Sequence, residues 1–330
     1  VSMLFAGISG SSTADAAGIG SLLIPAMKKQ GYDTSFSVAI TACSSVMGVI
    51  IPPSIMMIVW GGLMSVSIGG LFLAGMVPGI LIALFMMGTV LVYAKTRNYP
   101  IHKRASLMEF FQAFGKSILA LVTPTIIVGG IIGGLFTPTE ASVVAVLYSA
   151  FLGGFIYRAI GSKQFPRVLY DSARLSAISL FCIGTASAFG WLLAYYRVPQ
   201  ALVDIVATYG TGIITTGFII ALSFLVIGMF IDAIPAIIIL GTILLPLAEK
   251  AGMHPIHFAI IGVISLAFGL VTPPYGLCLL ISCSVGEVAV SKVLKDVAIL
   301  LLPLLLLLGL TIVFPEIVLF LPRWLAPEFL

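Results

Sequence analysis

Charged residues are scarce in this sequence. Asp, Glu, Lys and Arg make up only 8% of the 330 residues, whereas 60% are hydrophobic. Soluble globular domains carry roughly a quarter charged residues, so the composition excludes that class. We expect an all-α polytopic membrane protein lying in a lipid bilayer. The net charge of +4 is then no sign of nucleic-acid binding, and the distribution of the charges along the chain is what carries information.

Cysteine and histidine are also few. The four cysteines (Cys43, Cys182, Cys278 and Cys283) all lie in apolar runs without metal-ligand spacing, which favours buried small hydrophobic residues over a disulfide framework or a metal site. The three histidines lie in polar connectors, and the pair His254 and His257 beside a proline is weak evidence for a metal.

An enzyme is the remote alternative. Gly7-Ile8-Ser9-Gly10 matches the Gly-x-Ser-Gly pattern of intramembrane serine proteases of the rhomboid type, in which a histidine at membrane depth activates the serine. His102, His254 and His257 are all assigned to polar connectors, so no such base is expected at the depth of Ser9. The sequence has no Walker motif, and ATP hydrolysis within this chain is not expected. We therefore expect a protein that is not an enzyme, with no catalytic residues.

Two double prolines interrupt long apolar runs, in the stretches Gly48–Ser54 and Gly269–Tyr275. Proline has no backbone N–H, so a helix must break at each pair, and carbonyls such as those of Gly48 and Val49 are expected to lose their donors. Broken backbone at membrane depth is tolerated only where it is buried in protein or lines a polar cavity. Both breaks are therefore predicted to be binding sites.

The two breaks belong to an internal repeat at an offset of 221 residues. The matched pairs are Gly20/Gly241, Pro25/Pro246, Lys29/Lys250, Gly31/Gly252, Gly48/Gly269 and the double prolines. We predict a first repeat over 1–95, a connecting arm with scaffold helices over 96–174, and a second repeat over 175–330. The apolar stretch from about Ser176 to Ala221 has no counterpart, so we expect the chain to be truncated at its N-terminus.

Each repeat is predicted to open with a re-entrant hairpin. In the first, the small polar stretch 9–15 is followed by only twelve apolar residues, Ala16–Met27, too few to cross about 30 Å of hydrocarbon. Ser12 and Asp15 are expected to cap the returning helix, whose free N–H groups would favour an anion. Asp232 marks the second tip, before the apolar return to Glu249.

The remaining apolar runs predict spans separated by polar connectors. We expect spans at Phe36–Met64, Ile68–Ala94, Ser117–Phe136, Ala141–Tyr157, Leu175–Tyr196, His254–Cys283 and Val297–Leu321, a surface segment at Phe110–Lys116, an interfacial stretch near 198–209 and a polar connector at Gly286–Asp296. Threaded in alternation, this topology places thirteen of sixteen basic residues on one side and leaves Arg197, Lys250 and Arg323 on the other. Basic residues concentrate on the cytoplasmic side of membrane proteins, so this bias identifies that side. The two hairpins then open from opposite sides, as in an inverted repeat.

Two hairpin tips and two broken helices, related by an inverted repeat, are typical of secondary transporters. Na⁺ prefers oxygen ligands, which the carbonyls near Gly48 and Gly269 and the nearby hydroxyls could supply. Asp15, Asp232 and Glu140 are the acids expected at membrane depth, where ionisable groups are functional by default. The alternatives are structural: a helix cap for Asp15, a cap or hairpin lock for Asp232, and a helix start for Glu140 after Thr137-Pro138-Thr139.

Four motifs in this order resemble the large membrane subunit of tripartite ATP-independent periplasmic (TRAP) transporters. They are Phe5–Asp15, Ile51–Ser54, Gly134–Ala141 and Gly269–Gly276, and the resemblance covers essentially the whole chain. It implies a Na⁺-driven elevator importer of a small organic acid, such as a C4-dicarboxylate or sialic acid, in the bacterial inner membrane. A periplasmic binding protein would deliver the substrate, and a small four-helix membrane subunit would brace the scaffold.

The resemblance also implies positions for the Na⁺ ligands, and we predict substrate ligands close to them. The Na⁺ candidates are Ser11, Ser12, Gly48, Pro52, Asp232, Gly269, Thr272 and Gly276; the substrate candidates are Ser12, Thr13, Asp15, Ser54, Asp232, Thr272 and Tyr275. A related Na⁺/dicarboxylate symporter that needs no binding protein is the alternative. Neither reading identifies the substrate.

Overall fold

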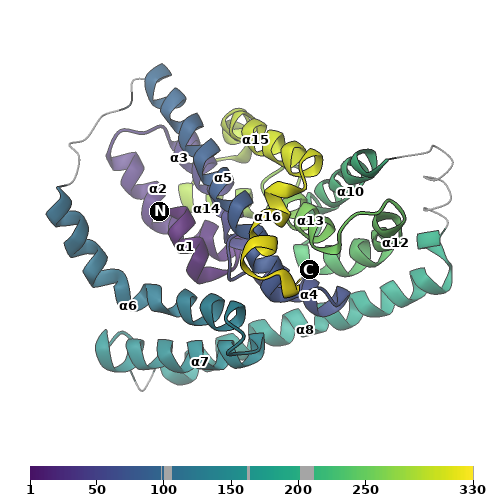
Figure 1. The fold of residues 1–330 in the computed structure, drawn as a ribbon. Coiled ribbons are helices and arrows are strands. Elements are labelled where there is room, and N and C mark those ends of the chain that lie inside the picture. The colour runs from purple at the N-terminus through teal and green to yellow at the C-terminus, as the bar shows by residue number, and fades with distance from the viewer. Residues whose placement is uncertain (98, 100–105, 162–163, 201–211, 330) are drawn as a thin grey trace. The chain divides into compact units, whose positions relative to one another are not determined.

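The protein is described by a computed structural model over residues 1–97, 99, 106–161, 164–200 and 212–329. Every regular element in these ranges is a helix (Figure 1), and the prediction of an all-α membrane protein is confirmed. Most of the basic loop 95–104 and of the interfacial stretch near 198–209 lies outside the described residues. The chain forms two compact units, one of residues 1–100 with 185–330 and one of residues 101–184.

The first half of the larger unit contains a short hairpin, a broken helix and a long span. Its elements are α1 (Ser2–Ser9), α2 (Ser12–Lys29), α3 (Thr34–Ser45), the 3₁₀ turn η1 (Val46–Val49), α4 (Ile55–Met64) and α5 (Ile68–Thr96). The predicted break therefore falls where expected, between η1 and α4, because Pro52 and Pro53 cannot donate to a continuing helix.

The second half has elements of the same kind. They are α10 (Ile213–Gly228), α11 (Ala233–Ala236), the π turn η3 (Ile237–Gly241), α12 (Thr242–Lys250), α13 (Pro255–Gly269), α14 (Leu277–Gly286), α15 (Val290–Val313), α16 (Glu316–Leu325) and the 3₁₀ turn η4 (Pro327–Phe329). The helical run from α11 to α12 covers the same positions as α2, 221 residues later. The inverted orientation of the two halves stays a prediction.

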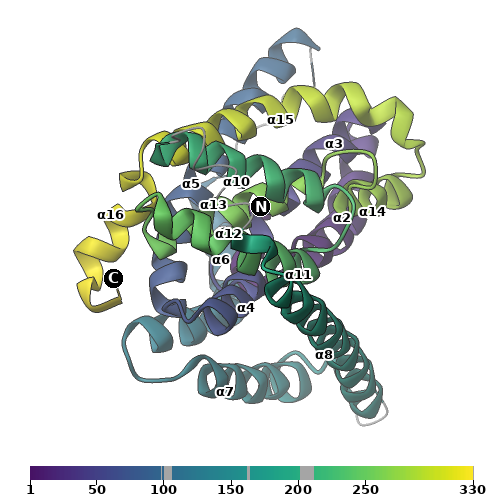
Figure 2. The same cartoon turned by 90° about the vertical axis from the view of Figure 1, so that its right-hand side faces the viewer.

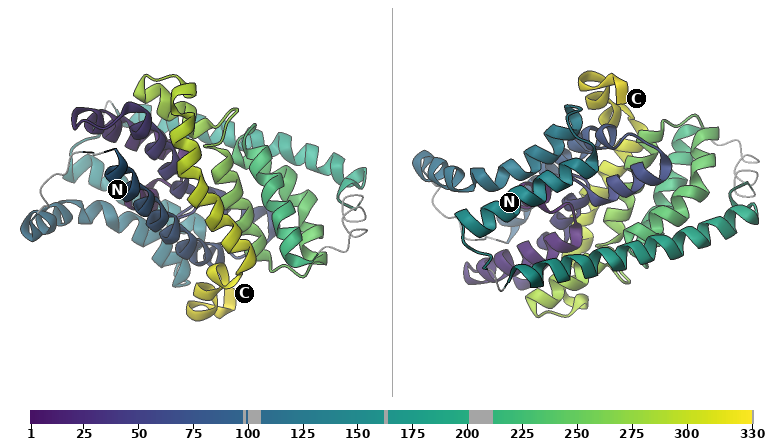
Figure 3. Two further views of the ribbon diagram at one scale, coloured as in Figure 1. Left: turned by 90° about the horizontal axis from the view of Figure 1, so that it is seen from above. Right: turned by 90° about the horizontal axis from the view of Figure 1, so that it is seen from below.

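Helices from the two halves interleave in the core of this unit. α10 packs along α13, and α14 packs against α2 and α3 (Figure 2). Trp60 of α4 has no exposed surface and meets the rings of Phe224 and Phe258 at centroid distances of 5.4 and 5.2 Å. α15 runs beside α3 and α5, as the view from above in Figure 3 shows. The two halves therefore share one core.

The smaller unit contains α6 (Leu107–Ile132), α7 (Pro138–Phe151), the π turn η2 (Leu152–Ile156) and the first part of α8 (Phe165–Tyr195). The predicted surface segment at 110–116 and the predicted span after it both lie in α6, which bends by 60° between Leu107–Gly115 and Ser117–Ile132. Glu140 is exposed and closes a capping box with Thr137 at the start of α7. The helix-start alternative thus accounts for Glu140 without a binding role.

Among the described helices, five segments are long and apolar enough to cross a bilayer: α5, α7 with η2, α8, the run from α11 to α12, and α15. The run from α11 to α12 qualifies by length and composition, and its predicted re-entrant course stays a prediction. The last predicted span, Val297–Leu321, is wrong in its bounds. α15 begins at Val290 and ends at Val313, because Pro315 stops the helix and α16 begins anew after it.

Candidate functional site

The first helix break is stabilised by Ser54. Its hydroxyl donates to the Val49 carbonyl at 2.6 Å and accepts from the Met57 amide at 3.3 Å, so the side chain serves both ends of the break. The expectation that the Val49 carbonyl is free is therefore wrong, because the serine hydroxyl replaces the amide donors that the two prolines lack. Ser54 is fully buried and committed to these bonds, which speaks against direct contact with substrate.

The first hairpin tip packs on this break. Gly10 has a left-handed backbone (φ 66°), and its carbonyl accepts from the Ile55 amide at 3.2 Å. A Cβ at Gly10 would lie 2.9 Å from the Pro53 carbonyl oxygen, closer than side chains approach. Glycine is thus required here both by the backbone angle and by the close contact. The tip and the break, more than forty residues apart, form one structure.

Ser11, not Ser12, caps the returning helix. Its backbone is extended (φ −144°, ψ 120°), and its hydroxyl accepts from the Ala14 amide at 3.4 Å. The prediction was one residue late because the left-handed Gly10 completes the turn and leaves Ser11 in the cap position. The Thr13 hydroxyl lies 3.0 Å from that of Ser11, so the two hydroxyls lie together at the helix start.

Asp15 is the central group of the site. Its side chain is fully buried, and a Cβ at Gly48 would lie 2.4 Å from Oδ2, so the carboxylate rests directly on the broken helix. Ser9 lies close enough to interact with it, yet neither carboxylate oxygen, nor the buried hydroxyl of Ser12, has a hydrogen-bond partner within the part of the chain that the structure describes. A charge buried without a partner is costly, and a cation at this point would relieve that cost.

The second tip is different. Asp232 stands at the start of α11 but is exposed, and its side chain makes no capping hydrogen bond. The Thr272 hydroxyl donates to the Phe268 carbonyl at 2.7 Å, and Tyr275, with 47% of its surface exposed, donates its amide to the Met229 carbonyl at 3.2 Å. The bond to Met229 joins the break to the end of α10, next to the tip, whereas the bond of Thr272 lies within the break.

Backbone packing brings the second break against α10. A Cβ at Gly269 would lie 2.7 Å from the backbone of Gly228, which is possible only because both residues are glycine. Gly276, which precedes α14, adopts a left-handed conformation (φ 50°). Gly269 and Gly276 thus have structural reasons for being glycine, and their role as Na⁺ ligands stays a prediction.

The two tips are not equivalent at the repeat offset. Asp232 corresponds to Ser11, since both are the cap residues of their helices, and Asp15 corresponds to the buried Ala236. Of the two tips, only the first therefore has a buried carboxylate. Cys278 is buried at the start of α14, and both Asp15 and Asp232 lie near enough to act on it electrostatically.

A polar cluster at the end of α5 was not predicted from the sequence. Asp296 of α15 is only 3% exposed, although it falls in a stretch predicted to be a polar connector. Its carboxylate accepts from Arg97 at 2.5 Å, from Ser35 at 2.6 Å and from Tyr93 at 3.2 Å. Arg97 also pairs with Asp33 at 3.0 Å. The position of Asp296 is the one sequence signal that could have indicated this. Asp296 follows Lys292 by one helical turn and stands directly before the apolar run of α15.

Burial and hydrogen bonds within this cluster shift the pKa values of Arg97 and Tyr99. Burial alone acts to lower the pKa of Arg97, but hydrogen bonds to Tyr99 and Asp296 outweigh it, and the pKa is raised. Burial raises the pKa of Tyr99, whose hydroxyl donates to Asp33 at 2.8 Å. The guanidinium is thus held charged and the phenol neutral at physiological pH.

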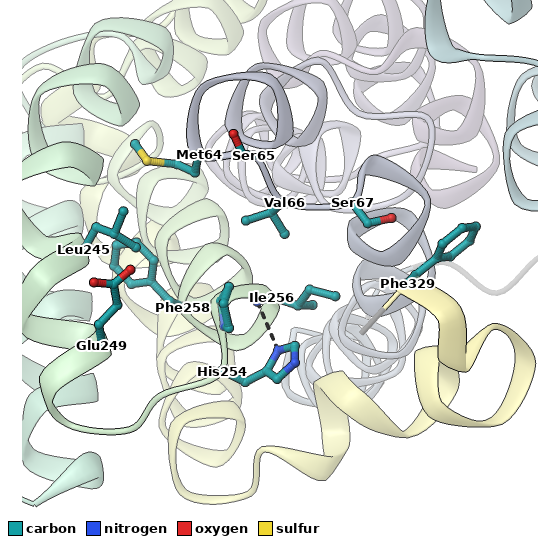
Figure 4. A pocket seen from close by; sticks show the side chains of 11 residues that line it. Met64, Ser65, Val66, Ser67, Leu245, Glu249, His254, Ile256, Phe258 and Phe329 are labelled. Atoms are coloured by element: carbon teal, nitrogen blue, oxygen red, sulfur yellow. Dashed lines mark hydrogen bonds between the residues drawn. The ribbon is translucent and has the colours of Figure 1, made fainter.

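A separate pocket of about 190 Å³ lies where α5 and α13 begin (Figure 4). The loop before α5, the end of α12 and Phe329 of η4 form its walls, with Glu249 and His254 as its titratable groups. His254 accepts from the Ile256 amide at 3.2 Å and so caps α13, whereas the buried His257 bonds the Thr311 carbonyl at 2.8 Å. The described residues contain no group of three or more potential metal-ligating side chains among His, Cys, Asp and Glu.

Comparison with known proteins gives a consistent result. The family model described as "Tripartite ATP-independent periplasmic transporter, DctM component" matches residues 1–317. The chain is 40% identical to the protein YgiK of Salmonella typhimurium, described as uncharacterized, over 98% of this chain and 75% of YgiK. It is 36% identical to the sialic acid TRAP transporter large permease protein SiaM of Vibrio cholerae, over 98% and 75% of the two chains.

The C4-dicarboxylate TRAP transporter large permease protein DctM of Pseudomonas aeruginosa is likewise 36% identical, over 98% of this chain and 76% of that protein. The resemblance seen in the four sequence motifs is thus confirmed, as is a location in the inner membrane. The chain belongs to the family of DctM components of tripartite ATP-independent periplasmic transporters.

Proposed function

We propose that this chain is the large membrane subunit of a Na⁺-coupled importer of a small organic acid. Related permeases are named for sialic acid, C4-dicarboxylate and isethionate, all of them organic anions at physiological pH. Secondary transport of an organic acid is the function that these relatives support. Na⁺ coupling and the elevator movement go beyond them and are argued from the site.

The observation that carries Na⁺ coupling is the buried Asp15 carboxylate. It lies on the break at Gly48, without a hydrogen-bond partner among the described residues, and the orphan hydroxyl of Ser12 is in the same helical turn. Ser11, Ser12 and the backbone near Gly48 and Pro52 would complete an oxygen cage around a hard cation. A bound Na⁺ would neutralise the carboxylate and fix the tip on the break.

Na⁺ must then bind before the substrate. The start of α2, with its free N–H groups and the hydroxyls of Ser12 and Thr13, favours an anion. An unneutralised Asp15 in the first turn of the same helix would repel a carboxylate at that point. Na⁺ removes the repulsion, and by linkage the substrate raises the affinity for Na⁺ by the same factor. The side of the substrate site opposite the start of α2 would be lined by Thr272, Tyr275 and the exposed Asp232.

The proposed cycle moves the two tips and breaks as one block between the two membrane surfaces. Each Na⁺ that enters down the membrane potential contributes about 2.3 kcal/mol per 100 mV. A small four-helix membrane subunit would hold the scaffold, and a periplasmic binding protein would supply the substrate, as the tripartite family description implies.

Uptake into proteoliposomes tests this function, with the full-length subunit, its small subunit and its binding protein. A panel of labelled organic acids is offered with and without an inward Na⁺ gradient. We expect uptake that requires both Na⁺ and the binding protein, and that Asp15→Asn abolishes. The exposed Asp171 of α8 supplies the control, Asp171→Asn, which should transport normally.

The alternatives predict other results. Uptake that needs Na⁺ but no binding protein would favour the simpler symporter. Uptake driven equally by K⁺, or full Na⁺ dependence in Asp15→Asn, would overturn the proposed coupling. The serine hydrolase alternative predicts cleavage activity that Ser9→Ala abolishes.

A further inference from the structure

α16 has three distinct faces, although it is only ten residues long. Val318, Leu319 and Pro322 are buried and face the protein, where α16 packs on α5 and α13. Glu316 and Arg323, two turns apart, form a salt bridge along one narrow stripe. The third face is apolar and exposed. The family match ends at residue 317, so it describes almost none of this helix.

The exposed apolar face is aromatic. Phe320 is 57% and Trp324 70% exposed, and their rings stack at a centroid distance of 6.3 Å, one turn apart. Leu325 is 51% exposed but lies about 100° further round the helix and is not part of this face. A soluble surface would rarely leave this much stacked aromatic area in water, whereas Trp beside a charged pair is typical of the boundary between lipid headgroups and acyl chains.

The place of α16 along the membrane normal follows from α5 and α15. Asp296 near the start of α15 bonds Tyr93 and Arg97 at the end of α5, so the two spans are antiparallel. The 29 residues of α5 extend about 43 Å, close to the full bilayer thickness with headgroups. α15 therefore leaves the membrane at the surface where α5 begins, and α16 starts three residues after α15 ends.

Both ends of α16 are held at that surface. The chain turns at Phe314 and Pro315, and after α16 the turn η4 brings Phe329 back onto the start of α5. A Cβ on Gly69 would lie 2.8 Å from the Phe329 ring, so the ring is seated against the glycine backbone. α16 is thus held on the protein beside α5 and α13 (Figure 2).

We propose that α16 is an interfacial anchor that binds phospholipid. Phe320 and Trp324 lie among the upper acyl chains, and the Glu316–Arg323 pair lies at headgroup level, where Arg323 can meet lipid phosphate. The anchor keeps the C-terminal end of α15, and the pocket wall formed by Phe329, from moving along the membrane normal. This inference depends on the membrane location alone and does not require the proposed Na⁺ coupling.

Fluorine NMR of the complete transporter in phosphatidylcholine nanodiscs tests the anchor. Tryptophan is replaced biosynthetically by fluorotryptophan, and Trp324→Phe assigns the Trp324 signal. Three paramagnetic probes are compared: a gadolinium chelate in water, a lipid nitroxide next to the headgroup, and a lipid nitroxide at the chain end. We expect the headgroup nitroxide to abolish the Trp324 signal while the other two leave most of it. Trp60, fully buried in the core, serves as the internal control.

Two results would overturn the anchor. Loss of the Trp324 signal to the gadolinium chelate would place this face in water. Persistence with all three probes would mean that a protein subunit covers it. Phe320→Glu provides a second test, because a charge on the same face should lift the helix end and move the Trp324 response from the headgroup nitroxide toward the gadolinium chelate. Uptake assays on the same preparations would report the transport function independently.

Discussion

The close contact of Gly48 with Asp15 is the most demanding feature at the scale of single residues. A methyl group at position 48 would lie 2.4 Å from Oδ2 and 3.0 Å from the backbone carbon of Ser11. Neither the buried Asp15 carboxylate nor the capped tip at Ser11 can move away from such a methyl group without losing its present packing. The glycine is therefore part of the site even though it has no side chain.

Gly48→Ala is expected to weaken Na⁺ activation of uptake. Overpacking costs about 1–3 kcal/mol, which corresponds to a rise of roughly 5- to 150-fold in the Na⁺ concentration for half-maximal uptake. Gly88→Ala in α5 is the matched control, because a Cβ there meets no atom within 4 Å. An unchanged Na⁺ dependence in Gly48→Ala would show that the contact does not shape the cation site.

Ser54→Ala removes two hydrogen bonds at once, the bond to the Val49 carbonyl and the cap of α4. The lost cap costs about 1 kcal/mol, and the buried carbonyl left without a donor costs about 1–3 kcal/mol more. Ser67→Ala removes only the cap of α5 and is the comparison. Thermal unfolding of the purified complex should show a clearly larger loss for Ser54→Ala; equal losses would mean that the Val49 bond contributes nothing.

At the scale of elements, the Asp296 cluster ties three segments together. Asp296 lies on α15, Tyr93 lies on α5 and Arg97 directly follows it, and Ser35 lies in the first turn of α3. All three donors point at one buried carboxylate. The cluster thus fixes the end of the long span α5 against the helix that leads into the first break.

Asp296→Asn should destabilise the protein far more than Asp33→Asn. The Asp296 side chain is 4% exposed, and removing one partner of a buried pair costs about 3–5 kcal/mol, reduced here because Arg97 is 29% exposed and keeps Asp33. The Asp33 side chain is 56% exposed, and such pairs contribute about 0–1 kcal/mol. Denaturation of the two variants in detergent measures the difference. Similar stability of both would contradict the central place of Asp296.

Sequence reasoning located the elements well where proline and glycine dictate them. The break before α4, the break before α14 and the helical runs that begin at Ser12 and Ala233 all follow from residues that cannot continue a helix. It failed where the outcome depends on tertiary partners. Asp296 reads as a connector residue until Arg97, 199 positions away, is seen beside it.

At the scale of the whole molecule, the two halves share helical bounds but not chemistry. The offset of 221 residues pairs Asp15 with Ala236 and Ser11 with Asp232. The sequence suggested two comparable acidic tips, and the structure instead buries one carboxylate and exposes the other. Burial could not be predicted from composition, because both residues stand in similar stretches between apolar runs.

Direct Na⁺ binding to the purified full-length transporter, without substrate, is the measurement that tests the central claim. Radioactive Na⁺ is titrated onto the wild type, Asp15→Asn and the exposed control Asp171→Asn. If Asp15 holds the coupling ion, the wild type and Asp171→Asn will bind Na⁺ saturably, and Asp15→Asn will have lost at least one bound Na⁺. Binding of the same number of Na⁺ ions with the same affinity in Asp15→Asn would contradict it.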